Sequence, residues 1–303
     1  MLLLLITVLS SAMMTVVFRT CEPKGYNWDN IQCTNYVFCV IFSLIAVFRS
    51  GTFGLFSHLK DVDWSILLTE KTIANSVLLA LLIGFFQGFL YVELLALSRI
   101  SYVVNGTSLT IMFEKAAFLV TIIVSVIFFS EMPTVLQIVG ILLAIVAIIM
   151  NASGKGENKL GSFGLILICF FSAAMNNLNH KLISSLTLNG EVQSIYVLTI
   201  FTFALIFNIL YIAFKNKKNK VKFHITGGEI LAGLIAGIPN YFFSILQLRC
   251  LAILPATIVY PTLAAGNLLV ITILSKLLFK EKITKLQYSS IVLTLVGLIL
   301  VNV

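Results

Sequence analysis

Long apolar runs separated by short polar loops follow one another along the whole chain. A bilayer core about 30 Å thick takes about 20 apolar residues to cross as a helix, and a helix satisfies its own backbone hydrogen bonds in lipid. The expected fold class is therefore an all-α polytopic membrane protein. The pattern predicts ten membrane-spanning helices, at residues 1–18, 31–48, 73–97, 101–129, 135–150, 161–179, 193–214, 228–248, 254–279 and 286–303.

The composition supports this reading and narrows the function. Hydrophobic residues make up 59% of the 303-residue chain and charged residues 11%. No polar stretch is long enough to form a separate soluble domain, so enzymes with large soluble domains are excluded. The net charge of +8 does not indicate a nucleic-acid partner, because the basic residues lie in short loops beside apolar runs, where they act as topology signals.

Internal repetition is the most informative feature of the sequence. Three matches occur in the same order in the two halves: LITVLSSAMMTVVFR (5–19) with LICFFSAAMNNLNHK (167–181), LLIGFFQ (81–87) with LIAGIPN (234–240), and SEMPTVLQ (130–137) with KEKITKLQ (280–287). We therefore expect two repeats of five spans each, at residues 1–151 and 161–303.

An odd number of spans in each repeat inverts the second repeat relative to the first. Inverted repeats are a transporter architecture, in which two nearly equivalent packings open a midplane site to one side or the other. The equivalent connections 49–72 and 215–227 should then lie on opposite membrane faces. The basic residues are concentrated in the loops after the odd-numbered spans, which favours both termini outside.

A family resemblance rests on the ten spans, the repeat and a few matched residues: Glu131 with Gln137, Glu281 with Gln287, and Arg19 with Lys181. With these features the chain resembles the drug/metabolite transporter superfamily, with two EamA-like halves. The resemblance covers nearly the whole chain. It implies that spans one to four and six to nine surround a central cavity, that the fifth and tenth support them, and that both termini lie inside, opposite to the charge pattern.

Prolines mark both an agreement with this family and a departure from it. Pro261 in span nine is a possible counterpart of the proline that the family has in span four, and it favours a kink. Tyr260, just before it, offers a ring and a hydroxyl at the bend. Span four has no proline, and Asn105 and Thr107 occupy the comparable region.

Polar residues inside the spans are candidate substrate contacts, because a polar group in hydrocarbon needs a partner. Gln87 and Tyr91 lie four residues apart in span three and share a helix face. Asn240 and Ser244 repeat that spacing at the corresponding place in span eight, as two walls of one cavity would. Asn176 lies furthest inside a polar cluster in span six. Interhelical hydrogen bonding is an equally good explanation for any one of these residues.

Glu114 and Lys115 stand side by side in the stretch TIMFEKAAFLV, near the middle of span four. A lone charge at this depth costs at least about 2.5–3.5 kcal/mol, so both residues need a partner or water. In one account Lys115 extends toward the membrane surface and Glu114 pairs with it loosely, as a structural contact. In the other, Glu114 faces the cavity and binds a proton or a cationic substrate in alternation.

The resulting expectation is a secondary transporter of a small organic metabolite or drug, in the cell (plasma) membrane, as a monomer or a homodimer. We expect no enzyme activity and no cofactor, because no catalytic set or phosphate-binding loop can be assembled from the sequence. The expected partners are the small-molecule substrate, possibly a coupled proton, and the lipid bilayer. A non-transporting membrane scaffold or sensor that reuses the fold is the alternative.

Overall fold

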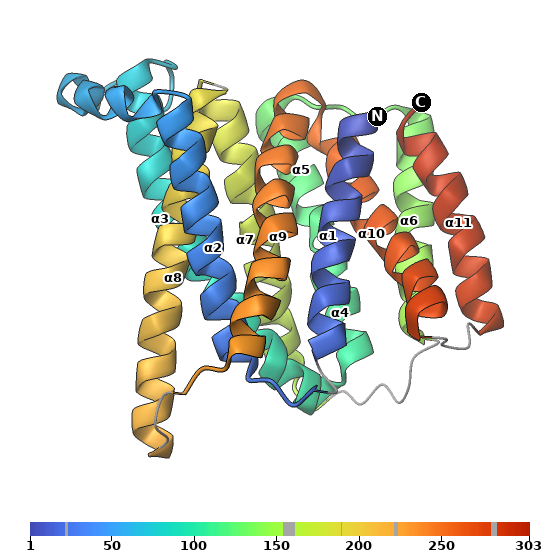
Figure 1. Ribbon diagram of the computed structural model, residues 1–303. Coiled ribbons are helices and arrows are strands. Elements are labelled where there is room, and N and C mark those ends of the chain that lie inside the picture. Colours follow the sequence, from blue (N-terminus) through green and yellow to red (C-terminus); the bar gives the residue numbers. More distant parts are fainter. Residues whose placement is uncertain (22–23, 154–160, 189, 221–223, 280–283) are drawn as a thin grey trace. The chain divides into compact units, whose positions relative to one another are not determined.

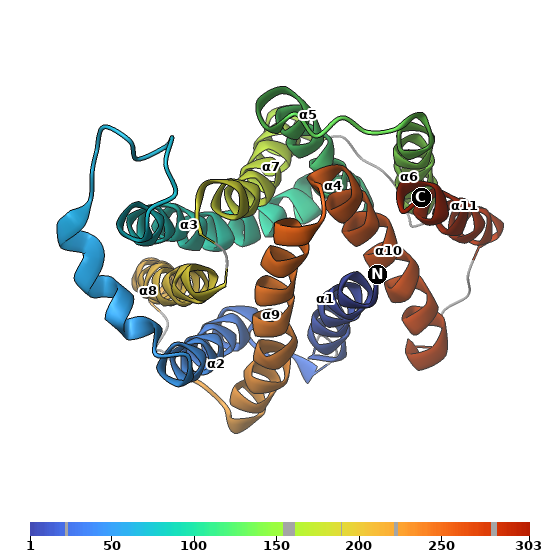
Figure 2. The same cartoon turned by 90° about the horizontal axis from the view of Figure 1, so that it is seen from above.

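Every regular element that the structure describes is a helix (Figures 1 and 2). The structure is a computed structural model that describes residues 1–21, 24–153, 161–188, 190–220, 224–279 and 284–303. The helices are α1 (Leu2–Cys21), α2 (Trp28–Arg49), the 3-10 helix η2 (Thr52–Asp61), α3 (Ile73–Asn105), α4 (Thr107–Ala116), α5 (Phe118–Phe129), α6 (Val135–Ser153), α7 (Phe163–Leu186), α8 (Glu191–Asn219), α9 (Gly227–Ile253), α10 (Ala256–Phe279) and α11 (Lys285–Val301).

The helices have the length and composition of membrane spans. Within the described residues, eight segments are long and apolar enough to cross a bilayer, with α4 and α5 together (Thr107–Phe129) counted as one. Two shorter apolar helices, Val135–Asn151 and Lys285–Val301, accompany them. The protein is therefore a multi-pass integral membrane protein with an all-helical fold.

Two predicted boundaries are wrong. The expected loop between spans three and four is helical, because nothing breaks the helix before Gly106, which has φ +82°. Arg99 consequently lies inside α3. Span four is also interrupted: α4 ends at Ala116 and α5 begins at Phe118. The interruption falls at Ala117, whose backbone stays in the right-handed helical region and whose N–H still donates to the Phe113 carbonyl.

The chain divides into two compact units. Unit 1 comprises Met1–Ala12, Glu93–Lys181 and Ile253–Val303, and unit 2 comprises Met13–Val92 and Leu182–Ala252. Each unit draws on both halves of the sequence, so the units do not coincide with the predicted repeats 1–151 and 161–303, which stay a prediction.

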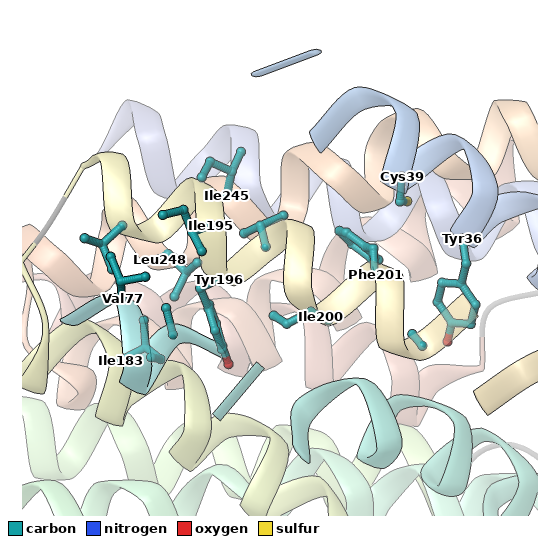
Figure 3. Packing of buried hydrophobic residues seen from close by; sticks show 14 residues of the cluster. Tyr36, Cys39, Val77, Ile183, Ile195, Tyr196, Ile200, Phe201, Ile245 and Leu248 are labelled. Carbon is teal, nitrogen blue, oxygen red and sulfur yellow. The ribbon is translucent and has the colours of Figure 1, made fainter. Parts of the chain in front are cut away.

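The core of unit 2 lies around α8, with contributions from α2, α3 and α9 (Figure 3). Tyr36 of α2 meets Phe201 of α8, with ring centroids 6.3 Å apart. Asp29 at the start of α2 forms an ion pair with Lys215 near the end of α8. Together these contacts show that α2 and α8 run antiparallel. The backbones of α3 and α8 also approach each other closely, since a Cβ at Gly88 of α3 would lie 2.8 Å from the Ala204 nitrogen of α8.

In unit 1, α6 and α11 pack closely through small residues. A Cβ at Gly140 would lie 2.8 Å from the Gly297 carbonyl oxygen, so the glycine permits backbone contact there. Because Gly140 of the first turns of α6 meets the last turns of α11, the two helices are antiparallel, as Figure 1 also shows. Buried Ala117, Ala173 and Ala174 form a second packing centre between α5 and α7.

Candidate functional site

The predicted site residues divide equally between the two units. Four lie in unit 2: Gln87, Tyr91, Asn240 and Ser244. The other four lie in unit 1: Glu114, Lys115, Asn176 and Tyr260.

In unit 2 the predicted pairs on α3 and α9 come together. The Tyr91 hydroxyl is within hydrogen-bonding reach of the Gln87 and Ser244 side chains. Gln87 and Ser244 are fully buried. The Ser244 hydroxyl also lies 3.1 Å from the carbonyl oxygen of Asn240, one turn earlier. The four-residue spacing on each helix thus brings the Gln87, Tyr91 and Ser244 side chains together, and Asn240 joins them through its backbone carbonyl.

Two residues of α2, Asn35 and Cys39, extend this cluster. Asn35 Oδ1 accepts from Asn240 Nδ2 at 3.2 Å and from the Cys39 thiol at 3.3 Å. The only sequence signal for these residues is their four-residue spacing in span two. Their alignment with Asn240 depends on how α2 packs against α9, which a hydrophobic pattern does not specify. We call Asn35, Cys39, Gln87, Tyr91, Asn240 and Ser244 the neutral network.

One donor of the neutral network is unsatisfied within the described part of the chain. Asn35 is 0% exposed, and its Nδ2 has no hydrogen-bond partner there. Exchanging the amide nitrogen and oxygen does not remove the problem, because the same position would then hold an unpaired acceptor. A buried unmet donor costs about 1–3 kcal/mol. The network therefore has capacity for one additional acceptor, such as a water or a ligand oxygen.

In unit 1, Glu114 and Lys115 occupy the last turn of α4, next to the break at Ala117. The Ser98 hydroxyl of α3 donates to Glu114 Oε1. Both charged residues are half-buried. Among the described residues none forms an ion pair with Lys115, and the two side chains interact only through their charges. Glu114 thus has a hydroxyl on α3 as its hydrogen-bond partner, and not its neighbour Lys115.

A second carboxylate, Glu93 of α3, lies in the same unit. Its Oε1 accepts from the Ser172 hydroxyl of α7 at 3.1 Å, and its Oε2 is buried without a partner among the described residues. Cys169 of α7 lies within electrostatic range of both Glu93 and Glu114. The sequence offers one signal for Glu93, since it is the single charge in the predicted span 73–97. We call Glu93, Glu114 and their serine donors the acidic cluster.

Asn176 and Tyr260 bond to the backbone of α7. Asn176 Nδ2 donates to the Ser172 carbonyl at 2.9 Å, and the Tyr260 hydroxyl donates to the Asn177 carbonyl at 2.5 Å. Both side chains are buried. Tyr260 immediately precedes Pro261 inside α10, so it ties the proline-containing turn to α7. These bonds account for both residues structurally, and substrate contact stays a prediction for them.

Lys181 and Glu131 form an ion pair at one end of unit 1. The Lys181 side chain is only 4% exposed, and Glu131 Oε2 also accepts from the Ala256 backbone N–H at 2.7 Å. Glu131 therefore joins α7 to the first residue of α10. The sequence comparison identified Glu131 and Lys181 as repeat positions, but it did not predict that they would meet. Glu281, the repeat counterpart of Glu131, lies outside the described residues.

Neither a metal site nor a disulfide is found in the described part of the chain. No three His, Cys, Asp or Glu side chains there are placed to hold a metal ion. Cys21 and Cys33 are free, as are the other described cysteines.

Comparison with known proteins supports the fold and identifies no function. No protein-family model matches the chain, and no curated protein does. Among solved structures, 26 chains match. One, described only as the crystal structure of a protein, superposes with a TM-score of 0.67 at 12% sequence identity, over 99% of this chain and 94% of the other. At this identity the likeness shows a shared fold alone.

Proposed function

We propose that the protein is a secondary transporter that moves a small organic metabolite or drug across the membrane by alternating access. The observation that carries the proposal is the antiparallel packing of corresponding helices from the two sequence halves. In unit 2 these are α2 and α8, the second spans of the predicted repeats. In unit 1 they are α6 and α11, the last spans.

Antiparallel pairing of equivalent helices is what an inverted repeat requires. It also places the η2 connection and the end of α8 at opposite ends of unit 2, as the repeat predicts for residues 49–72 and 215–227 (Figure 1). An inverted repeat has two nearly equivalent packings, each open to one side of the membrane. This equivalence is the physical reason to propose transport.

Matched helix caps add support for the repeat. The Thr134 hydroxyl accepts from the Gln137 backbone N–H at 3.2 Å, and the Gln137 side chain accepts from the Thr134 N–H at 3.0 Å. Thr284 and Gln287 make the same reciprocal bonds at the start of α11. The motif shared by SEMPTVLQ and KEKITKLQ thus has a local physical meaning as a capping box.

In this proposal Glu114 binds a proton or a cationic substrate in alternation. A carboxylate inside a span costs at least about 2.5–3.5 kcal/mol, and a single serine donor offsets only part of that cost. Lys115 is the next residue in the chain, and its positive charge attracts the Glu114 carboxylate without forming an ion pair with it. Within unit 2, substrate contact by the neutral network is a separate proposal, for which Asn35 Nδ2 is an available donor.

A non-transporting scaffold or sensor is the second candidate. The observation that favours it is the internal satisfaction of the neutral network, in which Tyr91, Ser244 and Asn240 already bond to one another or to neighbouring side chains. Such bonds hold helices together whether or not a solute crosses.

The experiment that decides between these candidates couples ligand binding to flux. A thermal-shift screen of the purified protein against a metabolite and drug panel first identifies ligands that stabilise it. Each hit is then followed into proteoliposomes, with protein-free liposomes as the baseline. We expect at least one stabilising ligand to accumulate. Ligands that bind while none crosses would identify a scaffold or sensor.

The remaining expectations accompany this proposal. We place the chain with the drug/metabolite transporter superfamily, as an EamA-like protein of ten spans in two inverted repeats, located in the plasma membrane. It would function without a cofactor, as a monomer or a homodimer.

A further inference from the structure

The connection between α2 and α3 contains an amphipathic 3-10 helix. Such a helix has three residues per turn, so side chains three apart share a face. In η2, Phe53, Phe56 and Leu59 share one face, while Ser57 and Lys60 share another. One face of η2 is therefore apolar and one is polar, while the third, with Leu55, His58 and Asp61, is mixed.

The apolar side of η2 is only partly covered by the protein. Phe56 packs against the buried core of unit 2. Phe53 is exposed, and its ring lies 4.6 Å from that of Phe48, itself exposed in the last turn of α2. Ile41 and Ile45 continue this exposed stripe along α2. An uninterrupted apolar surface thus runs from a membrane-spanning helix onto η2.

The position of η2 corresponds to the edge of the hydrocarbon core. The 22 residues of α2 span about 33 Å at 1.5 Å per residue, close to the thickness of the bilayer core. The element that follows must then begin at the membrane surface. Figure 1 shows η2 running sideways from the end of α2, and Figure 2 shows it along the outer edge of unit 2.

The segment after η2 presents a tryptophan to its surroundings. Trp64 is 72% exposed, and Leu68 is exposed as well. On either side of Trp64 the chain is polar: the Ser65 hydroxyl and backbone N–H donate to Asp63 Oδ1 at 2.6 and 2.9 Å. These bonds lower the pKa of Asp63, so its carboxylate stays ionised and in water. Apolar and ionised side chains side by side are typical of a segment at an interface.

We infer that residues 52–68 lie in the boundary between lipid headgroups and acyl chains, with Phe53 and Trp64 as its anchors. Tryptophan prefers this boundary because its ring is apolar and its indole N–H can bond to water or headgroups. The bilayer is the occupant rather than a protein partner, since the apolar stripe of α2 continues onto η2 without a break. The inference does not depend on transport.

Depth-dependent fluorescence quenching tests this inference. The chain has two tryptophans, so Trp28→Phe leaves Trp64 alone. In phosphatidylcholine vesicles we expect bromine at carbons 6 and 7 of an acyl chain to quench Trp64 more strongly than bromine at carbons 11 and 12. Aqueous iodide should quench it at least about twofold less than it quenches a freely exposed indole.

The polar face of η2 supplies the matched control. In a Trp28→Phe, Trp64→Phe background, Ser57→Trp should be quenched by iodide and little by bromolipid. If Trp64 shows the iodide pattern instead, the segment lies in water and the inference is wrong. Should Trp28→Phe disturb folding, because Trp28 stacks on Phe18 at 5.2 Å, Trp28→Tyr with selective excitation of tryptophan gives the same comparison.

Discussion

Unit 2 and unit 1 bury polar side chains of different chemistry. The neutral network of unit 2 consists of amides, hydroxyls and a thiol, and most of its groups bond to one another. The acidic cluster of unit 1 contains two carboxylates, Glu93 and Glu114, each bonded to a serine. Neither carboxylate forms an ion pair among the described residues.

The neutral groups are suited to hold helices together, whereas the carboxylates are suited to bind a ligand. Neutral hydrogen bonds between membrane helices contribute modestly, about 0.6–2 kcal/mol each, and serve structure without further explanation. An unpaired carboxylate opposes insertion, so stability alone does not account for it. Under the proposed function, unit 1 is therefore the candidate for the coupling chemistry, and unit 2 mainly positions helices.

The largest expected effect concerns the ion pairs, which also differ between units. Lys181→Met should lower the free energy of unfolding by about 3–5 kcal/mol, because Glu131 keeps a buried charge without its partner. Lys215→Met in unit 2 should cost less, about 1–3 kcal/mol, because the lost lysine is 42% exposed. Asp29 is itself only 6% exposed, but it stays in the first turn of α2, where the helix N-terminus favours its negative charge. Steric trapping in bicelles measures both values.

A double variant controls for lost packing. Adding Glu131→Gln to Lys181→Met should restore part of the stability, because it removes the orphaned charge. Equal losses for Lys181→Met and Lys215→Met would mean that the two pairs are energetically alike.

Removing a carboxylate and removing a neutral hydroxyl should act in opposite directions. Glu93→Gln should leave stability unchanged or raise it by about 1–2 kcal/mol, because it removes a half-buried charge inside a span. Tyr91→Phe should lower stability by about 1 kcal/mol through its lost bonds to Gln87 and Ser244. Thermal unfolding in one detergent compares the pair, and destabilisation by both would remove the distinction between the units.

The unmet donor of Asn35 gives a finer test of the neutral network. Asn35→Asp keeps the size and the acceptor for Asn240 but introduces a charge that the fully buried site does not need. We expect a loss of about 1–3 kcal/mol, whereas Ser244→Ala should cost about 1 kcal/mol. Unaltered melting of the Asn35→Asp variant would show that the site hydrates the carboxylate or keeps it protonated, and the expected penalty for a buried charge would then be wrong.

The smallest effects test the repeat. Thr134→Ala and Thr284→Ala each remove one cap of the same kind, so each should cost about 0.5–2 kcal/mol, and the two losses should agree closely. Melting temperatures of the two variants give the comparison. A clear loss at one position with none at the other would indicate that the matched motifs are not equivalent in the folded protein.

The sequence predicted the helices well because apolar length determines whether a segment spans a bilayer. One of its errors occurs where tertiary packing decides a helix boundary. The break at Ala117 has no proline or glycine to announce it, and it lies where buried Ala117 packs with Ala173 and Ala174 of α7. The end of α3 had a visible signal in Gly106, the first residue there suited to positive φ.

The sequence could predict those contacts of the candidate site that depend on residue spacing within one helix. Gln87 with Tyr91, and Asn240 with Ser244, lie one turn apart and meet in the structure. Asn35 could not be added, because its contact with Asn240 depends on the register between α2 and α9. Likewise, nothing in the sequence pairs Glu114 with Ser98 of another helix, so its local partner emerges only from the fold.

The most direct test of the account is the pH dependence of solute flux through the Glu114→Gln variant. The matched control is Glu191→Gln, because Glu191 is an exposed glutamate at the start of α8. Flux of a hit from the ligand screen is measured in proteoliposomes over a range of about three pH units. The account predicts that Glu114→Gln stays folded but loses flux or its pH dependence, while Glu191→Gln behaves as wild type. Normal, pH-dependent flux through Glu114→Gln would contradict it and leave Glu114 a structural residue.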